Sequence, residues 1–293
     1  MKTSKSILIL SAALMSAGCA SWHVTDNDVM KPDRISGYRI EKSFDEAALR
    51  ALIPDAVLAT ETLEVAPDVR LGGLRITQPQ AVATVLYFPG GGDHIDNAVR
   101  SMARLVANCP VNLVMFDYRG FGRSNGEHSA ATLKSDSLKI YDHYRQQTQG
   151  YLFVHGYSMG SFMTAYLAQQ RQPQAIILQA TASSMQAAMQ QRLPGWVQTL
   201  MEFRLSEGMA AMDNVAAVSQ YPRPALVIAG SADTQTPENL GRRVFDALPS
   251  AHKQWISVPG GTHTNLLQST RVKAAYCDFI RLHAQPPEGN RQP

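Results

Sequence analysis

Short apolar runs alternate with amphipathic stretches along most of the chain. These runs lie at residues 83–88, 111–116, 151–154, 175–178, 225–229 and 254–258. Apolar runs of this length are typical of strands that are buried on both faces of a parallel sheet. Helices are predicted over 98–107, 132–147 and 161–170. The pattern predicts an α/β fold with a mostly parallel central sheet and helices on both faces.

Two stretches upstream alternate apolar and polar positions, around residues 62–65 and 73–76. Alternation with period two is typical of strands with one exposed face, so these stretches predict two edge strands. A short helix is predicted over 44–52.

The largest insertion in this alternation lies between Thr181 and Tyr221 and is rich in Met and Ala. It predicts a small helical cap at about residues 182–222. Because thioether side chains adapt to flexible chains, large cap side chains could line an acyl pocket. They could equally pack the cap onto the sheet, and the sequence leaves both roles open. The side chains in question are Met185, Met189, Trp196, Met201 and Phe203.

Composition limits the number of domains and the class of partner. The chain has 293 residues, of which 45% are hydrophobic and 17% charged, which predicts one domain, at 36–285, followed by a disordered tail at 286–293. The net charge of +3 is spread along the chain without a Lys/Arg block, so nucleic-acid binding has no support. The histidines are scattered and no cysteines have metal-ligand spacing, so no metal and no cofactor are predicted.

The N-terminus has the pattern of a secretory signal. Lys2 and Lys5 precede an apolar stretch, 7–15, which ends in small residues before Cys19. The stretch is too short to span a bilayer, so residues 1–18 are predicted to be a signal peptide.

The cysteine directly after Ala17-Gly18 resembles a bacterial lipobox, although Ser16 stands where leucine is usual. The resemblance implies lipidation of Cys19 and a membrane anchor, with residues 19–35 as a polar tether. Because Ala20 rather than aspartate follows the cysteine, it also implies the outer membrane, facing the periplasm. The alternative is simple secretion, with Cys19 incidental.

Gly156-Tyr157-Ser158-Met159-Gly160 joins the apolar run 151–154 to the predicted helix 161–170. A serine at such a strand-to-helix turn is lifted out of the sheet on strained backbone. The flanking glycines let strand and helix approach closely. The motif predicts an exposed, reactive hydroxyl; a plain glycine-rich turn is the alternative.

Together with this motif, the Gly90–Gly92 loop and the stretches FDYRGFGRSNGE, GSADTQTP and GGTH occur in the order seen in α/β-hydrolases. The chain resembles that superfamily over roughly residues 60–285, and most resembles its branch with a small cap, which includes bacterial esterases and eukaryotic protein depalmitoylases. The resemblance implies a catalytic triad of Ser158, Asp233 and His263, in that chain order.

The chemistry needs a base for the serine and a carboxylate that orients the base. His263 follows a glycine pair at the carboxyl end of the last strand, where ligands collect in open α/β sheets. Asp233 follows the strand 225–229, and its alternative role is to cap the helix near Pro237. Asp117 and Arg119 are predicted to hold a loop. The rival histidines are His94, His128, His143, His155 and His252.

A tetrahedral intermediate needs two N–H donors for its oxyanion. The N–H of Met159, at the start of a helix, is one candidate. The other should come from the glycine loop, with Gly91 preferred and the register uncertain by one residue.

These features predict a serine hydrolase that cleaves carboxylic esters or thioesters, in small-molecule or acylated substrates, through an acyl-enzyme. A peptidase or amidase on the same fold is the first alternative. A non-catalytic envelope binding or scaffold protein is the second. The oligomeric state remains open.

Cys109 and Cys277 remain after Cys19 in a chain predicted to be exported. In the α/β-hydrolase pattern their helices cover the same face of the sheet, so the thiols can meet. Because small buried cysteines commonly act as core residues, we expect two free, buried thiols rather than a disulfide.

Overall fold

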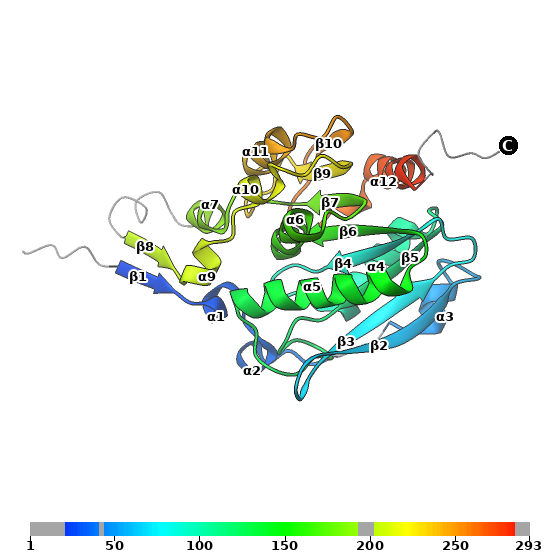
Figure 1. Cartoon of the computed structure of the whole chain (residues 1–293), viewed down its shortest axis with the longest axis horizontal. Coiled ribbons are helices and arrows are strands. Elements are labelled where there is room, and N and C mark those ends of the chain that lie inside the picture. Colours follow the sequence, from blue (N-terminus) through cyan, green and yellow to red (C-terminus); the bar gives the residue numbers. More distant parts are fainter. Residues whose placement is uncertain (1–20, 41–43, 193–201, 285–293) are drawn as a thin grey trace, which may run out of the picture.

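An eight-stranded sheet runs through the part of the chain that the computed structural model describes, residues 21–40, 44–192 and 202–284 (Figure 1). Its order is β10-β9-β7-β6-β4-β5-β3-β2. β3 pairs antiparallel with β2 and β5, and the other neighbours pair in parallel, which confirms the predicted mostly parallel sheet. The strands are β2 (Val57–Ala66), β3 (Val69–Thr77), β4 (Ala83–Phe88), β5 (Val111–Phe116), β6 (Tyr151–Tyr157), β7 (Ala175–Gln179), β9 (Ala225–Gly230) and β10 (Lys253–Val258). The predicted signal peptide 1–18, Cys19 and the predicted tail 286–293 lie outside the described residues.

Helices cover both faces of the sheet, as predicted. One face packs against α3 (Glu46–Arg50), α4 (Ile95–Val106) and α12 (Thr270–His283). The other face, toward the viewer in Figure 1, packs against α5 (Ala130–Gln147), α6 (Met159–Arg171) and α11 (Glu238–Ala247). Strands β4, β7 and β9 are buried along their whole length, because helices cover them from both sides.

The insertion after β7 forms a cap that is only partly helical. It contains α7 (Met185–Gln191), β8 (Glu202–Leu205), α9 (Glu207–Ala210) and α10 (Asn214–Val218). The strand β8 is a difference from the predicted helical cap, and it exists because it pairs in parallel with β1 (Ser21–Val24) near the N-terminus.

The cap side chains proposed for an acyl pocket are only partly described. Met185 is buried in one core cluster and Met189 packs against that cluster, which favours the packing role for both. Trp196, Met201 and the side chain of Phe203 lie outside what the structure describes.

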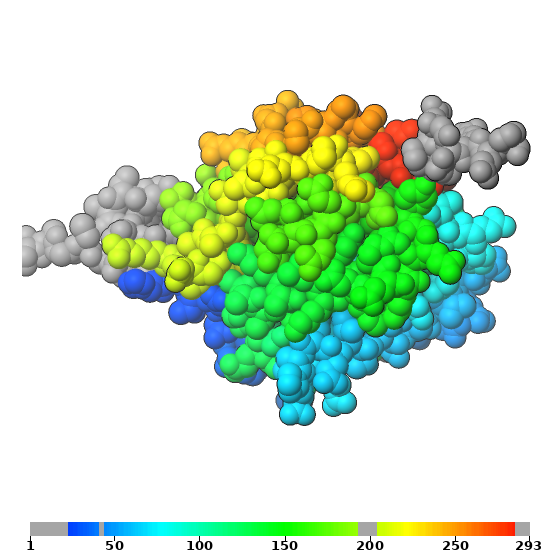
Figure 2. Space-filling view, in the orientation of Figure 1, coloured from blue at the N-terminus to red at the C-terminus, as the bar shows by residue number. Residues whose placement is uncertain are grey.

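Residues 21–40 fold onto the domain, so the prediction of a polar tether is wrong from Ser21 onward. This segment, which we call the arm, contains β1, α1 (Asp26–Val29) and α2 (Asp33–Ser36). Val24 and Met30 are buried. Figure 2 shows the blue arm lying against the yellow-green cap. Two of the polar residues that suggested a solvated tether instead bond to the domain: Asp26 accepts the N–H of Ala130, and Asp33 accepts the N–H of Gly122.

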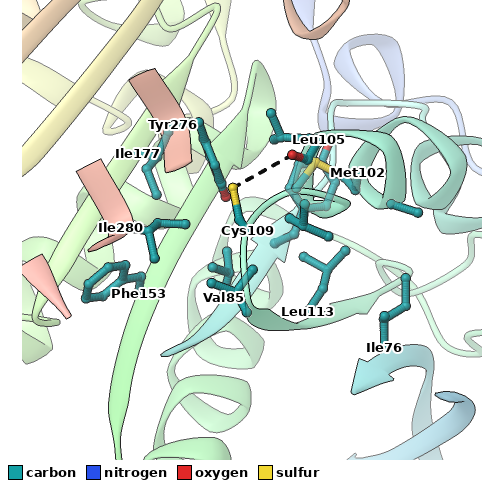
Figure 3. Close-up of a cluster of buried hydrophobic side chains, with 14 of the residues drawn as sticks. Ile76, Val85, Met102, Leu105, Cys109, Leu113, Phe153, Ile177, Tyr276 and Ile280 are labelled. Carbon is teal, nitrogen blue, oxygen red and sulfur yellow. Dashed lines mark hydrogen bonds between the residues drawn. The ribbon is translucent and has the colours of Figure 1, made fainter. Parts of the chain in front are cut away.

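The prediction of two free thiols is also wrong, because Cys109 and Cys277 form a disulfide. Cys109 lies just after α4 and Cys277 lies in α12, and the two helices meet on the same face of the sheet. Their Cα atoms are 5.3 Å apart, within the range that a disulfide requires. Figure 3 shows Cys109 among the side chains of Val85, Leu113 and Ile280, so the bond is buried in the core.

Candidate active site

Ser158 lies between β6 and α6 with a strained backbone, at φ 52° and ψ −113°. Close packing around the turn explains why such a conformation persists. A Cβ on Gly156 would clash with the carbonyl of Gly160, and a Cβ on Gly160 would clash with the carbonyl of Phe88. The two glycines therefore let α6 start directly against β4 and β6, and the turn presents the Ser158 hydroxyl at the carboxyl edge of the sheet.

The structure brings together the three side chains that the sequence proposed as a triad. Ser158 Oγ lies 2.9 Å from His263 Nε2, and His263 Nδ1 lies 2.8 Å from Asp233 Oδ2. Because the carboxylate can only accept at Nδ1, that nitrogen carries the proton, and Nε2 is left to accept from the serine hydroxyl. His263 and Asp233 are 7% and 4% exposed, so both hydrogen bonds are shielded from bulk water.

The loop after β9 holds Asp233 as a carboxylate. Its Oδ1 accepts the N–H groups of Gln235 and Thr236, at 2.8 and 2.9 Å. Burial alone raises the pKa of Asp233, but the hydrogen bonds from His263 and Thr236 outweigh burial and leave the pKa below its ordinary value. The carboxylate is therefore charged at neutral pH, as a partner for an imidazolium requires.

Thr236 is a site residue that sequence reasoning missed. Its Oγ1 donates to Asp233 Oδ2 at 2.8 Å and lies 3.2 Å from His263 Nδ1. The hydroxyl thus fixes the carboxylate and the imidazole together. The only signal in the sequence is its place three residues after Asp233 in GSADTQTP, a spacing that suits an Asp-centred turn.

The proposed oxyanion donors are neighbours in space. Met159 begins α6, and a Cβ on Gly91 would lie 3.4 Å from the Cβ of Met159. The same Cβ would lie 3.2 Å from Met30 of the arm, so the arm packs against the glycine loop. The N–H groups of Gly91 and Met159 as oxyanion donors remain a prediction, supported by the closeness of these two residues and by the place of Met159 directly after Ser158.

The rival histidines lie in other surroundings. His155 is fully buried, where its Nε2 lies 3.1 Å from Gln179 Oε1, and burial lowers its pKa to about 3. His94 precedes α4 and its Nε2 pairs with Asp33 of the arm at 2.7 Å. His128 contacts the arm at the carbonyl of Asp26. The two others, His143 and His252, lie in α5 and in the turn before β10.

Asp117 and Arg119 have the structural role that was predicted. Asp117 accepts the backbone N–H groups of Ile95 and Arg123, both at 2.9 Å, and burial raises its pKa to about 6. Arg119 makes a two-pronged ion pair with Asp136 at 2.7 Å. Both residues hold the loop after β5 in place.

Over residues 21–40, 44–192 and 202–284 no group of three or more His, Cys, Asp and Glu side chains is arranged to hold a metal ion. No helix in those ranges is long and apolar enough to cross a membrane.

Comparison with known proteins identifies the family. The family model described as "Serine aminopeptidase, S33" matches residues 79–212. YfhR of Salmonella typhi is 31% identical over 216 residues, which cover 68% of this chain and 70% of YfhR. The chain belongs to the YfhR family of α/β-hydrolases. Human ABHD12B is a more distant relative, 23% identical over 67% of this chain and 60% of its own length.

Solved structures agree on the fold. The esterase Pf2001 of Pyrococcus furiosus superposes with a TM-score of 0.64, covering 85% of this chain and 99% of its own, at 14% identity. Est1E of Butyrivibrio proteoclasticus, solved with ferulic acid, has a TM-score of 0.64 over 76% of this chain and 98% of its own, at 17% identity. At these identities the likeness shows the α/β-hydrolase fold, and membership of the family indicates a hydrolase.

Proposed function

We propose that this protein is a serine hydrolase that cleaves carboxylic esters or thioesters through an acyl-enzyme. The observation that carries the proposal is the unbroken line of hydrogen bonds from Ser158 Oγ through His263 to Asp233. A serine hydroxyl is a weak nucleophile at neutral pH, and this arrangement supplies the base that it lacks.

In the proposed reaction His263 Nε2 takes the proton of Ser158 as Oγ attacks the acyl carbon. The negative oxygen of the tetrahedral intermediate is stabilised by the N–H groups of Gly91 and Met159. The imidazolium, stabilised by Asp233, then gives its proton to the departing alcohol or thiol. Water activated by the same histidine hydrolyses the acyl-enzyme and restores Ser158.

The first experiment replaces the nucleophile. We expect Ser158→Ala to lower turnover of p-nitrophenyl esters by about 10⁴-fold or more and to abolish labelling by a fluorophosphonate, with the fold intact. His263→Ala should cause a similar loss of turnover, and Asp233→Asn a smaller one. Undiminished labelling of Ser158→Ala would overturn the assignment.

A peptidase or amidase is the second candidate function, and the description of the matching family as a serine aminopeptidase favours it. Esters and amides can use the same nucleophile, base and oxyanion donors. A panel of p-nitrophenyl esters and aminoacyl anilides separates the two, because an amidase would turn over the anilides at rates comparable to the esters. A non-catalytic scaffold would react with neither substrate and would not be labelled.

We also propose that Cys19 is lipidated and anchors the protein at the outer membrane, facing the periplasm. The signal-like start and the small residues before the cysteine support this proposal. Metabolic labelling with palmitate should mark the wild-type protein but not Cys19→Ser. A mature periplasmic protein with an N-terminus other than residue 19 would contradict lipidation.

A further inference from the structure

A cavity of about 310 Å³ lies near His263, between α4, which lines it from Asn97 to Arg104, and the segment after β10. Thr264, which follows His263, lines it, and so does Tyr157, whose ring centroid is 5.3 Å from that of His263. Gln179 also lines it and accepts the N–H of Ser158 through its carbonyl at 2.9 Å. Ser158 and His263 do not line the cavity themselves, but Tyr157 and Thr264, their neighbours in sequence, do.

Asp93 is the acidic side chain of this cavity, and the proposed mechanism does not use it. It follows the glycine loop, partly buried, and forms no ion pair with a Lys or Arg of the described residues. Burial raises its pKa, against the opposing influence of His263, His94 and the N–H of Gly90. A positive charge beside a partly desolvated carboxylate stabilises its charged form.

Two tyrosines complete the surroundings of Asp93. Tyr87 is the next-to-last residue of β4 and Tyr157 the last of β6, and both line the cavity. Their aromatic faces attract cations, and an ammonium beside aromatic rings and a carboxylate is a recurrent mode of binding. This end of the cavity has the chemistry of an ammonium site.

The position of the cavity indicates which part of a substrate would occupy it. His263 gives its proton to the leaving group, so the leaving group lies on the side of His263. Thr264 lines the cavity, whereas Gly91 and Met159, the proposed oxyanion donors, do not. The space thus lies toward the leaving group rather than toward the oxyanion.

We propose that this cavity is a leaving-group subsite for amino alcohols, in which Asp93 pairs with the ammonium of the ester's alcohol. The proposal rests on the proposed ester hydrolysis and adds a substrate class to it. Arg104 and Lys273 line the same cavity, so a leaving group with several positive charges is disfavoured.

The test compares butyrylcholine with its uncharged isostere 3,3-dimethylbutyl butyrate. We expect wild-type kcat/KM to favour the choline ester by about tenfold or more, because only its quaternary ammonium can make the ionic contact with Asp93 and the cation–π contacts with the tyrosines. In Asp93→Asn this ratio should fall to about one, with little change for the neutral ester. Asp278→Asn removes an exposed carboxylate of α12 and should keep the wild-type ratio.

Three results would overturn the proposal. The first is a wild-type ratio near one with both esters turned over. The second is an equal loss for both esters in Asp93→Asn, since this would make Asp93 a positioning residue for His263. The third is a loss of the preference in Asp278→Asn as well, which would make it an effect of overall charge.

Direct binding separates this proposal from that of the hydrolase. Calorimetry should show choline binding to Ser158→Ala and weaker binding of 3,3-dimethylbutanol. Binding of choline by a protein that hydrolyses no ester would leave the subsite in place and reject the proposed function. Hydrolysis of neutral esters without choline binding would reject only the subsite. If Asp93→Asn does not fold, inhibition of the wild-type enzyme is measured instead. Competitive inhibition of neutral-ester hydrolysis by choline would support the subsite, and no inhibition would reject it.

Discussion

His155 and His263 show how two residues of one type differ once the sheet surrounds them. Both follow apolar runs, yet His155 is inside β6 and His263 is in the loop beyond β10. Burial keeps His155 neutral and lowers its pKa to about 3, while His263 reaches Ser158 and Asp233. The order of motifs predicted this division of roles from the sequence.

The first residue-scale prediction is that His155 makes the fold sensitive to acid. An unfolded histidine has a pKa of about 6.5, so below that pH the unfolded chain binds a proton that the folded protein, with a pKa of about 3, does not. Stability from this residue is present above pH 6.5 and is lost as pH falls toward 3. At pH 5 the loss is about 2 kcal/mol.

Urea unfolding at pH 7.5 and pH 5 measures this effect. Wild type should lose about 2 kcal/mol more of its free energy of unfolding than His155→Gln between the two pH values. His143→Gln, which removes a ring at the surface of α5, is the control and should behave as wild type. Equal losses in wild type and His155→Gln would contradict the prediction.

Some residues of the site could not be predicted, because their contacts come from distant parts of the chain. Ser158, Asp233 and His263 belong to recognisable motifs, and the structure brings them together. Thr236 lies close to His263 only because of how the loop after β9 is placed. Asp93 belongs to no motif, and its surroundings depend on Tyr87 and Tyr157, which the fold brings to the same cavity.

At the scale of elements, the arm is where the sequence misled. Residues 21–40 are polar on average, and a polar average predicts a solvated segment. Yet Asp26 and Asp33 make hydrogen bonds to the domain, and Val24 and Met30 bury apolar side chains against it. Pairing of β1 with β8 joins segments far apart in sequence, and strands of four residues give no local signal for it.

The arm leads to an element-scale prediction about Asp33. Its carboxylate pairs with His94 Nε2 at 2.7 Å and accepts the N–H of Gly122 at 2.8 Å, while the ring of Tyr38 stacks on His94 with centroids 3.4 Å apart. These contacts fasten the arm next to the glycine loop. We expect Asp33→Ala to lower the free energy of unfolding by about 1–3 kcal/mol, because the buried His94 and the partly buried N–H of Gly122 lose their partner.

The same variant should lower kcat several-fold with a smaller change in KM, because Met30 would no longer be held against Gly91. Steady-state kinetics with a p-nitrophenyl ester, beside thermal unfolding, measure both effects. Asp55→Ala, which removes an exposed carboxylate in the turn after α3, is the matched control. An arm that only covers the surface would give a kcat equal to that of the control.

At the scale of the whole molecule, the sequence predicted the layers better than the links between them. The runs 83–88 and 111–116 coincide with β4 and β5, and the alternation of strands and helices gave the parallel sheet. Such patterns are local, so they can be detected in the chain alone. The disulfide depends on where the helices α4 and α12 lie relative to each other, and the pairing of arm with cap depends on the positions of β1 and β8. No local sequence pattern specifies these positions.

The disulfide carries the last prediction, which concerns the domain as a whole. Cys109 and Cys277 are 168 residues apart in sequence, so the bond closes most of the domain into one loop and restricts the unfolded chain. We expect Cys109→Ser/Cys277→Ser to lower the free energy of unfolding by between about 2 and 5 kcal/mol.

Activity should respond differently from stability. Cys109 lies beyond the end of α4, the helix that starts beside the glycine loop, and Cys277 lies midway along α12, which starts after His263. The cross-link therefore ties these helices away from both catalytic loops, and kcat/KM at 25 °C should match wild type. Intact mass of the purified, non-reduced protein should show a two-dalton deficit that reductant removes. A full-thiol mass in the non-reduced protein, with a midpoint in urea unchanged by reductant, would show that the two helices are held by packing alone.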